Sequence, residues 1–154
     1  MRAQAWANLG TIRNGASRFV DAETACREAV AIKEKLADTF PSIPQHRQEL
    51  GAAFNNLGTV LTSLNRVDEG KSAYEKAIRL YERLAADSPA ETRYAALLAG
   101  TWSNMGGLLS DAGRRGESLP WINRAIEALE SALSRDQRMA KVRATLCAAA
   151  GREP

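Results

Sequence analysis

The segment "FNNLG" at Phe54–Gly58 has near-copies on both sides, "WANLG" at Trp6–Gly10 and "WSNMG" at Trp102–Gly106. Each copy is displaced from the next by 48 positions. The same displacement aligns three arginines, three alanines and three glutamates elsewhere in the chain: Arg18, Arg66 and Arg114; Ala29, Ala77 and Ala125; Glu34, Glu82 and Glu130. A period of this size indicates an array of stacked repeat units.

Each unit contains two helical patterns separated by a turn. Phe54, Leu57 and Leu61 have the spacing of a helix with one apolar stripe, and a second stripe begins at Tyr74. No sustained alternation of apolar and polar residues indicates a strand. The sequence therefore predicts an all-α chain of helical hairpins. The expected helices lie near residues 3–14, 19–38, 44–64, 68–86, 90–112, 117–135 and 138–150.

Local residues give the expected helix ends. Asp68 is predicted to be the N-cap of the fourth helix, and the residue before Pro89 is disfavoured in the α region, which ends that helix. Pro120 is expected in the first turn of the sixth helix, where a missing N–H does little harm. Glu75 and Arg79 are spaced for an exposed ion pair along the fourth helix.

The length of 154 residues fits one domain, here a single array over residues 1–154. We divide it into units at about 1–42, 43–90 and 91–136, followed by a terminal helix at 137–154. The 21 basic and 18 acidic residues are dispersed, so the formal charge of +3 does not indicate a nucleic-acid partner. The longest apolar run, "YAALLAG", is too short to span a membrane.

Two cysteines, Cys26 and Cys147, lie far apart in the sequence. They have neither the spacing of a metal site nor the density of a secreted disulfide scaffold. We therefore expect both to be reduced and the protein to be cytoplasmic.

The repeated pattern resembles the tetratricopeptide repeat family, in which a large residue and Leu-Gly are followed by Ala, an aromatic residue and another Ala in the second helix. The matching positions are Trp6, Leu9, Gly10, Ala22, Cys26 and Ala29; Phe54, Leu57, Gly58, Leu61, Gly70, Tyr74 and Ala77; and Trp102, Met105, Gly106, Leu109, Ser118, Ile122 and Ala125. The small residues let the two helices of a hairpin approach closely, and the ring fills the space beside them.

The resemblance implies a right-handed α-solenoid of about seven helices that binds peptides or proteins without catalysis. Two features depart from the family pattern. The period is 48 residues where the family's is usually 34, which resembles the long-repeat, kinesin-light-chain-type variant. Arg13 stands where the family usually has a large ring.

The recurring asparagine lies opposite the apolar stripe. With Phe54 at zero on a helical wheel, Leu57 and Leu61 fall within about 60° and Asn56 at about 200°. In the family, this outward side of the first helix lines the concave groove. A primary amide can pair with both the C=O and the N–H of a peptide backbone. The candidate peptide-binding residues are Asn8, Thr11, Asn56, Thr59, Ser63, Asn104, Asp111 and Arg93.

Two alternatives stay open. Each asparagine could instead bond to a neighbouring helix and hold the stack together, or simply face water. The array could also be a structural module that self-associates as a homo-oligomer through its ends. Trp121, whose counterparts Ala25 and Ala73 are small, either caps the array or contacts another subunit, and the segment "KVRATLCAAAG" would offer an apolar end.

Catalysis is not expected. His46 is the single histidine and follows Pro44 at a helix start, which is typical of a surface position. Cys26 occupies the aromatic position of its unit, so core packing explains it. The sequence contains no phosphate-binding glycine loop and no nucleophile motif. We therefore expect no enzyme activity, no cofactor and no metal.

Overall fold

A computed structural model of the protein describes the backbone of residues 2–133 and the side chains of residues 18–131. The described backbone forms five α-helices and no strand, which confirms the all-α prediction. The helices are α1 (Arg2–Thr39), α2 (Pro44–Ser63), α3 (Val67–Asp87), α4 (Thr92–Asp111) and α5 (Arg115–Leu133). The expected terminal helix at 137–154, with Cys147, lies outside the described residues.

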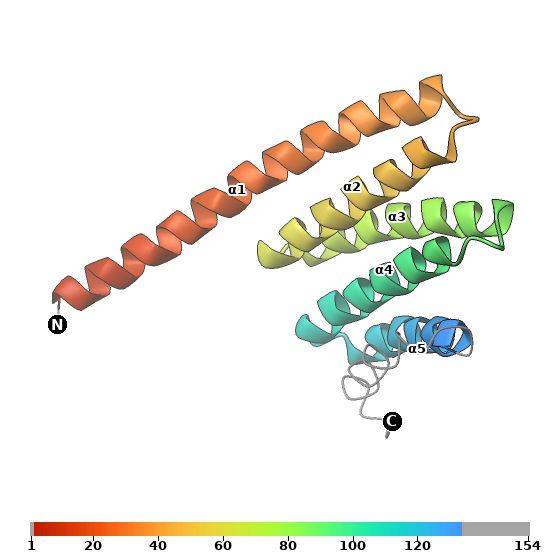
Figure 1. Cartoon of the computed structure of the whole chain (residues 1–154). Helices are drawn as coiled ribbons and strands as arrows, with labels where there is room; N and C mark the ends of the chain where they lie inside the picture. Colours follow the sequence, from red (N-terminus) through yellow and green to blue (C-terminus); the bar gives the residue numbers. More distant parts are fainter. Residues whose placement is uncertain (1, 134–154) are drawn as a thin grey trace.

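The helices stack in sequence order (Figure 1). Each packs against its chain neighbours, and α2 also contacts α4. The hairpins α2–α3 and α4–α5 lie within the stretches expected as the second and third units. This arrangement agrees with a helical repeat.

Glycines at matching positions set the closeness of these hairpins. A Cβ added at Gly58 would lie 2.6 Å from a ring carbon of Tyr74, and one added at Gly106 would lie 2.5 Å from Cγ1 of Ile122. Because real Cβ atoms do not approach so closely, each glycine admits the large side chain of the partner helix. Tyr74 and Ile122 are correspondingly buried at 2% and 7% exposure.

The turns inside the two hairpins also repeat. Arg66 N–H donates to the Leu61 carbonyl at 2.9 Å, and Arg114 N–H donates to the Leu109 carbonyl at 2.8 Å. Each turn contains one residue with positive φ, which is Asn65 at 57° in the first case and Gly113 at 75° in the second. The two turns are therefore equivalent residue by residue.

The first unit does not form the predicted hairpin. Residues 3–14 and 19–38 were expected as two helices, but α1 runs without a break from Arg2 to Thr39 and extends beyond the other helices (Figure 1). The position that matches Asn65 and Gly113 is Ser17. Glycine, and to a lesser extent asparagine, adopts the left-handed conformation readily, whereas serine seldom does. The residue that would start the turn is therefore missing.

Arg13 adds a second reason. It aligns with Leu61 and Leu109, which are buried in the later units at 2% and 0% exposure. Closing a first hairpin in the same way would place a guanidinium in the equivalent apolar site, and an unpaired buried charge is costly. Two local differences therefore favour the continuous helix.

Three smaller predictions were also wrong. Asp68 is not the N-cap of α3, since the helix begins at Val67 and Asp68 lies in its first turn. Pro120 lies in the second turn, because α5 begins at Arg115. The expected pair between Glu75 and Arg79 is not formed within the described side chains.

Candidate functional site

The predicted outward side of α2 is exposed. Asn56, Thr59 and Ser63 lie three and four residues apart, which places them along one side of the helix, and all three are exposed. Thr59 and Ser63 each donate a hydroxyl hydrogen bond to a carbonyl four residues earlier, both at 3.1 Å. Among the described residues, Asn56 has no side-chain hydrogen bond, so its amide is available.

The matching side of α4 is also exposed. Arg93, Asn104 and Asp111 are separated by eleven and seven residues, close to whole numbers of turns, and all are exposed. Gly100 and Gly107 lie on the same side, and a Cβ added at either would meet nothing within 4 Å. The backbone of α4 is therefore open to close approach on both sides of Asn104.

A hydrogen bond joins these two exposed sides. Asn104 Nδ2 donates to Asn55 Oδ1 at 3.0 Å. Asn104 thus has the helix-bridging contact that was left open as the alternative to ligand binding. Sequence comparison missed Asn55, because its counterparts Ala7 and Ser103 are not asparagines and the repeat gives no signal there.

Arg93 is held at the edge of this surface. Its guanidinium donates to Tyr94 Oη at 3.0 Å, lies 4.8 Å from the ring centre of Tyr94, and pairs with Glu91 at 3.3 Å. We use "α2–α4 surface" for the residues Asn56, Thr59, Ser63, Arg93, Asn104 and Asp111.

Two predicted site residues are not part of the α2–α4 surface. Asn8 and Thr11 lie in the N-terminal half of α1, which continues the helix instead of turning back (Figure 1). Their side chains lie outside the described ones. Of the predicted residues, Asn104 therefore contacts α2 through Asn55, and Asn8 and Thr11 lie apart on α1.

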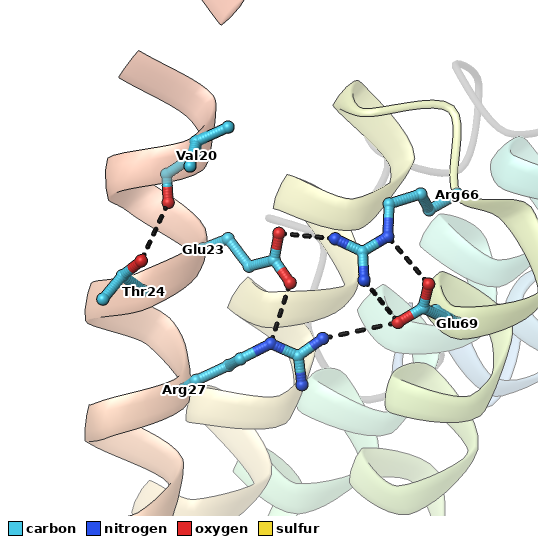
Figure 2. Close-up of polar contacts among 6 residues, drawn as sticks. All are labelled: Val20, Glu23, Thr24, Arg27, Arg66 and Glu69. Atoms are coloured by element: carbon cyan, nitrogen blue, oxygen red, sulfur yellow. Dashed lines mark hydrogen bonds and ion pairs between the residues drawn. The ribbon is translucent and has the colours of Figure 1, made fainter. Parts of the chain in front are cut away.

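A cluster of four charged residues links α1 to the start of α3 (Figure 2). Arg66 donates to Glu69 at 2.7 Å within its own unit and to Glu23 of α1 at 2.5 Å. Arg27 pairs with Glu23 at 2.8 Å and with Glu69 at 3.4 Å. Hydrogen bonds from Arg27 and Arg66 hold the pKa of the Glu23 and Glu69 carboxyls, respectively, below their ordinary value. Both carboxylates are therefore stabilised in the ionised form.

The next unit has a related arrangement, although the position equivalent to Glu23 is Lys71 and the acid of the preceding unit is Asp68. Arg114, which directly precedes α5, donates to Glu117 in the first turn of α5 at 2.7 Å and to Asp68 at 2.9 Å. Hydrogen bonds from Arg114 lower the pKa of Glu117, and the same contacts raise the pKa of Arg114. The aligned arginines, each followed by an acid three residues later, carried a sequence signal that the site prediction did not use. These contacts connect repeat units.

No group of three or more His, Cys, Asp or Glu side chains that could hold a metal ion occurs among the described residues. His46 packs near the Phe40 ring with centroids 5.8 Å apart. Burial raises the pKa of the Cys26 thiol, which disfavours the nucleophilic thiolate. None of the helices in the described region is long and apolar enough to cross a membrane.

Comparison with known proteins bears on the region that holds the first complete hairpin. Residues 50–90, which contain most of α2 and all of α3, match the family model for the tetratricopeptide repeat. The match supports a tetratricopeptide-repeat family for this chain. Such repeats generally mediate protein–protein interaction and are not catalytic. Comparison with curated proteins gives no match.

Proposed function

We propose that the protein is an interaction module whose α2–α4 surface binds an extended segment of a partner protein. The observation that carries this proposal is the exposed, free amide of Asn56, which follows Asn55, the residue that accepts a hydrogen bond from Asn104 of α4. Hydrogen bonds to a peptide backbone would use both the carbonyl and the N–H₂ of that amide. The uncovered backbone at Gly100 and Gly107 supports the proposal, because it leaves room for a ligand main chain.

The two asparagines have different roles in this proposal. Asn56 binds the ligand directly. Asn104 holds α4 against α2 through its hydrogen bond to Asn55, and its side-chain carbonyl and second N–H remain for the ligand. Helices packed together lie roughly 8–10 Å apart, and an extended peptide advances about 3.3 Å per residue. Neighbouring helices that line the surface would therefore contact about every third residue of the ligand.

The proposed array is a right-handed solenoid of the long-repeat type over residues 1–154, acting in the cytoplasm. The equivalent turns and glycine contacts of the α2–α3 and α4–α5 hairpins support the 48-residue unit. The low cysteine content supports a reducing compartment.

Peptide selection followed by titration tests the proposed surface. A random dodecapeptide library is selected against the whole chain, and the recovered peptide is titrated by fluorescence anisotropy. Asn56→Ala should weaken binding by about two- to tenfold, the loss of one net hydrogen bond, without changing the melting temperature. Asn123→Ala on α5 is the matched control and should leave affinity unchanged.

Two results would contradict this function. Equal binding by wild type and Asn56→Ala would place the ligand elsewhere. A fall in melting temperature for Asn56→Ala that is comparable to the fall for Asn104→Ala would mean that both residues stabilise the packing of the helices and do not bind the ligand.

Self-association is the second candidate function, and α1 supplies the observation that favours it. Phe19, Val20 and Ile32 are exposed at 41%, 54% and 59%, so α1 presents apolar surface to solvent. Trp121 is half-buried beside Arg124, whose guanidinium lies 5.2 Å from the indole. Sedimentation over a hundredfold concentration range distinguishes the functions, since a stable dimer weakened by Phe19→Ser and Ile32→Ser would support association.

A further inference from the structure

A second hollow surface lies on the side of α2 opposite Asn56, between α1 and α3. Two adjoining depressions of about 130 Å³ and 200 Å³ share Phe54 and Lys76 in their walls. Their floor is formed by Leu50, Phe54, Leu57 and Leu61 of α2. We call this continuous feature the α1–α3 groove.

Three cations line the α3 wall of the groove. Lys76, Arg79 and Arg83 are separated by three and four residues, so they follow one side of α3, and all three are exposed. None of them forms an ion pair with a carboxylate in the described part of the chain. This contrasts with Arg27, Arg66 and the other arginines of the inter-unit clusters, whose charges are matched.

The acidic residues of the groove do not neutralise this row. The larger depression has one carboxylate, Glu34, against the three cations. The smaller one has Glu69, which is already bound by Arg66 and Arg27. The groove therefore has a local excess of positive charge above an apolar floor.

The neighbouring depression between α3 and α5 shows that this excess is local. Its volume is about 390 Å³, and it is lined by Glu75 and Glu82 as well as Arg79 and Arg124. Two carboxylates face two cations there, and one of these cations, Arg79, also lines the groove. Lys76 and Arg83 line the groove and not this depression, so the excess of positive charge is larger in the groove.

Lys76 also connects the cationic wall with the apolar floor. Its ammonium lies 5.0 Å from the centre of the Phe54 ring, within the range of a cation–π contact. Phe54 is only 5% exposed, so its ring lies beneath Lys76, which is itself exposed and open to a carboxylate.

We propose that the α1–α3 groove binds an acidic peptide segment of a partner protein, with carboxylates on Lys76, Arg79 and Arg83. The site is separate from the α2–α4 surface, because Asn56 lies on the opposite side of α2. An extended peptide of nine residues spans about 30 Å, and the 21-residue helix α3 is of similar length.

The probe is a fluorescein-labelled peptide of nine residues, with aspartates and glutamates on both sides of a central leucine. Its amide counterpart, with Asn and Gln in place of the acids, is the ligand control. Anisotropy titrations at 50 mM and 200 mM salt should show binding of the acidic peptide only, weakening as salt rises because the contacts are exposed.

Charge reversal on α3 tests the assignment to the groove. The double substitution Arg79→Glu and Arg83→Glu should reduce affinity at least about tenfold, a loss of 1.4 kcal/mol. Lys35→Glu with Arg115→Glu makes the same change in net charge on exposed positions outside the groove and should alter affinity less than about twofold. Circular dichroism establishes that both variants remain folded.

The remaining outcomes overturn the proposal. An equal loss in both double variants would mean attraction by net charge alone. Absence of binding by the acidic peptide, or tighter binding of a single-stranded oligonucleotide of equal charge, would exclude this class of ligand. Asn56→Ala should not change the affinity for the acidic peptide. The proposal for the groove and the proposal for the α2–α4 surface are therefore tested independently.

Discussion

Helix α1 and the α2–α3 hairpin derive from equivalent stretches of sequence but have different shapes. Trp6–Gly10 and Phe54–Gly58 carry the same helix pattern, and similar patterns follow each of them. The second stretch folds back at Asn65, whereas the first continues as one helix through Ser17 to Thr39. A repeat signature therefore specifies which helix faces are apolar, while a few residues decide whether the chain turns.

The largest expected effect is conversion of α1 into a hairpin. Arg13→Leu with Ser17→Gly restores the two features that α2–α3 and α4–α5 share. Spin labels at Gln4 and Ile32 should lie about 42 Å apart in the continuous helix, at 1.5 Å per residue, and on the order of 10 Å apart in a hairpin. Double electron–electron resonance spectroscopy measures distances in this range and distinguishes the two structures.

Arg13→Lys with Ser17→Ala is the matched control, since it preserves charge and helix-forming character. Its labels should remain at the long distance. A short distance already present in the unsubstituted chain would mean that the first unit is a hairpin like the others.

Substitution by alanine at the equivalent positions Gly58 and Gly10 should change the free energy of unfolding in opposite directions. In Gly58→Ala the new Cβ would lie 2.6 Å from Tyr74, and overpacking of this kind costs about 1–3 kcal/mol. In Gly10→Ala the residue stays within a continuous helix, where alanine is favoured over glycine by about 1 kcal/mol. Urea unfolding gives both values.

Gly100→Ala is the internal reference for this pair. A Cβ there meets nothing within 4 Å, so it should be stabilising, as expected for Gly10→Ala. A destabilisation of Gly10→Ala equal to that of Gly58→Ala would show that α1 packs against a second helix at that point.

Substitutions at the residues with positive φ in the two turns should have a smaller effect on stability. Gly113→Ala requires alanine to adopt a φ of 75°, at a cost of about 1–2 kcal/mol. Asn65→Gly should instead be tolerated, because glycine adopts this conformation without steric penalty. If Gly113→Ala were neutral in thermal unfolding, the turn residue would not explain why α1 is continuous.

The smallest expected effect concerns pH. The pKa values of Glu23 and Glu69 are lowered from 4.5 by the neighbouring arginines. Their contribution to stability is therefore complete above that ordinary value and is lost as the pH falls through the lowered one. The melting temperature should decline below pH 4.5, and Glu69→Gln should decline less steeply. Parallel curves for the two proteins would contradict a role for this cluster in stability.

The sequence was sufficient to predict the all-α class and four of the helices, because Phe54, Tyr74 and their counterparts repeat at helical spacing. It did not predict the course of α1, since a helical pattern has the same period with or without a turn inside it. The exposure of Asn56 and Asn104 followed from the wheel. The bond between Asn104 and Asn55 did not, because it depends on how two helices are rotated against each other.

The contacts of Arg66 and Arg114 have a consequence for how the molecule opens. Each arginine binds an acid in the first turn of the helix that follows it and an acid of the preceding unit, so loss of one unit removes an ion pair from the next. Opening should therefore spread from neighbour to neighbour, as in a one-dimensional chain. Amide hydrogens of α3 and α4 should exchange with deuterium last, and fraying should begin in the part of α1 that extends beyond α2.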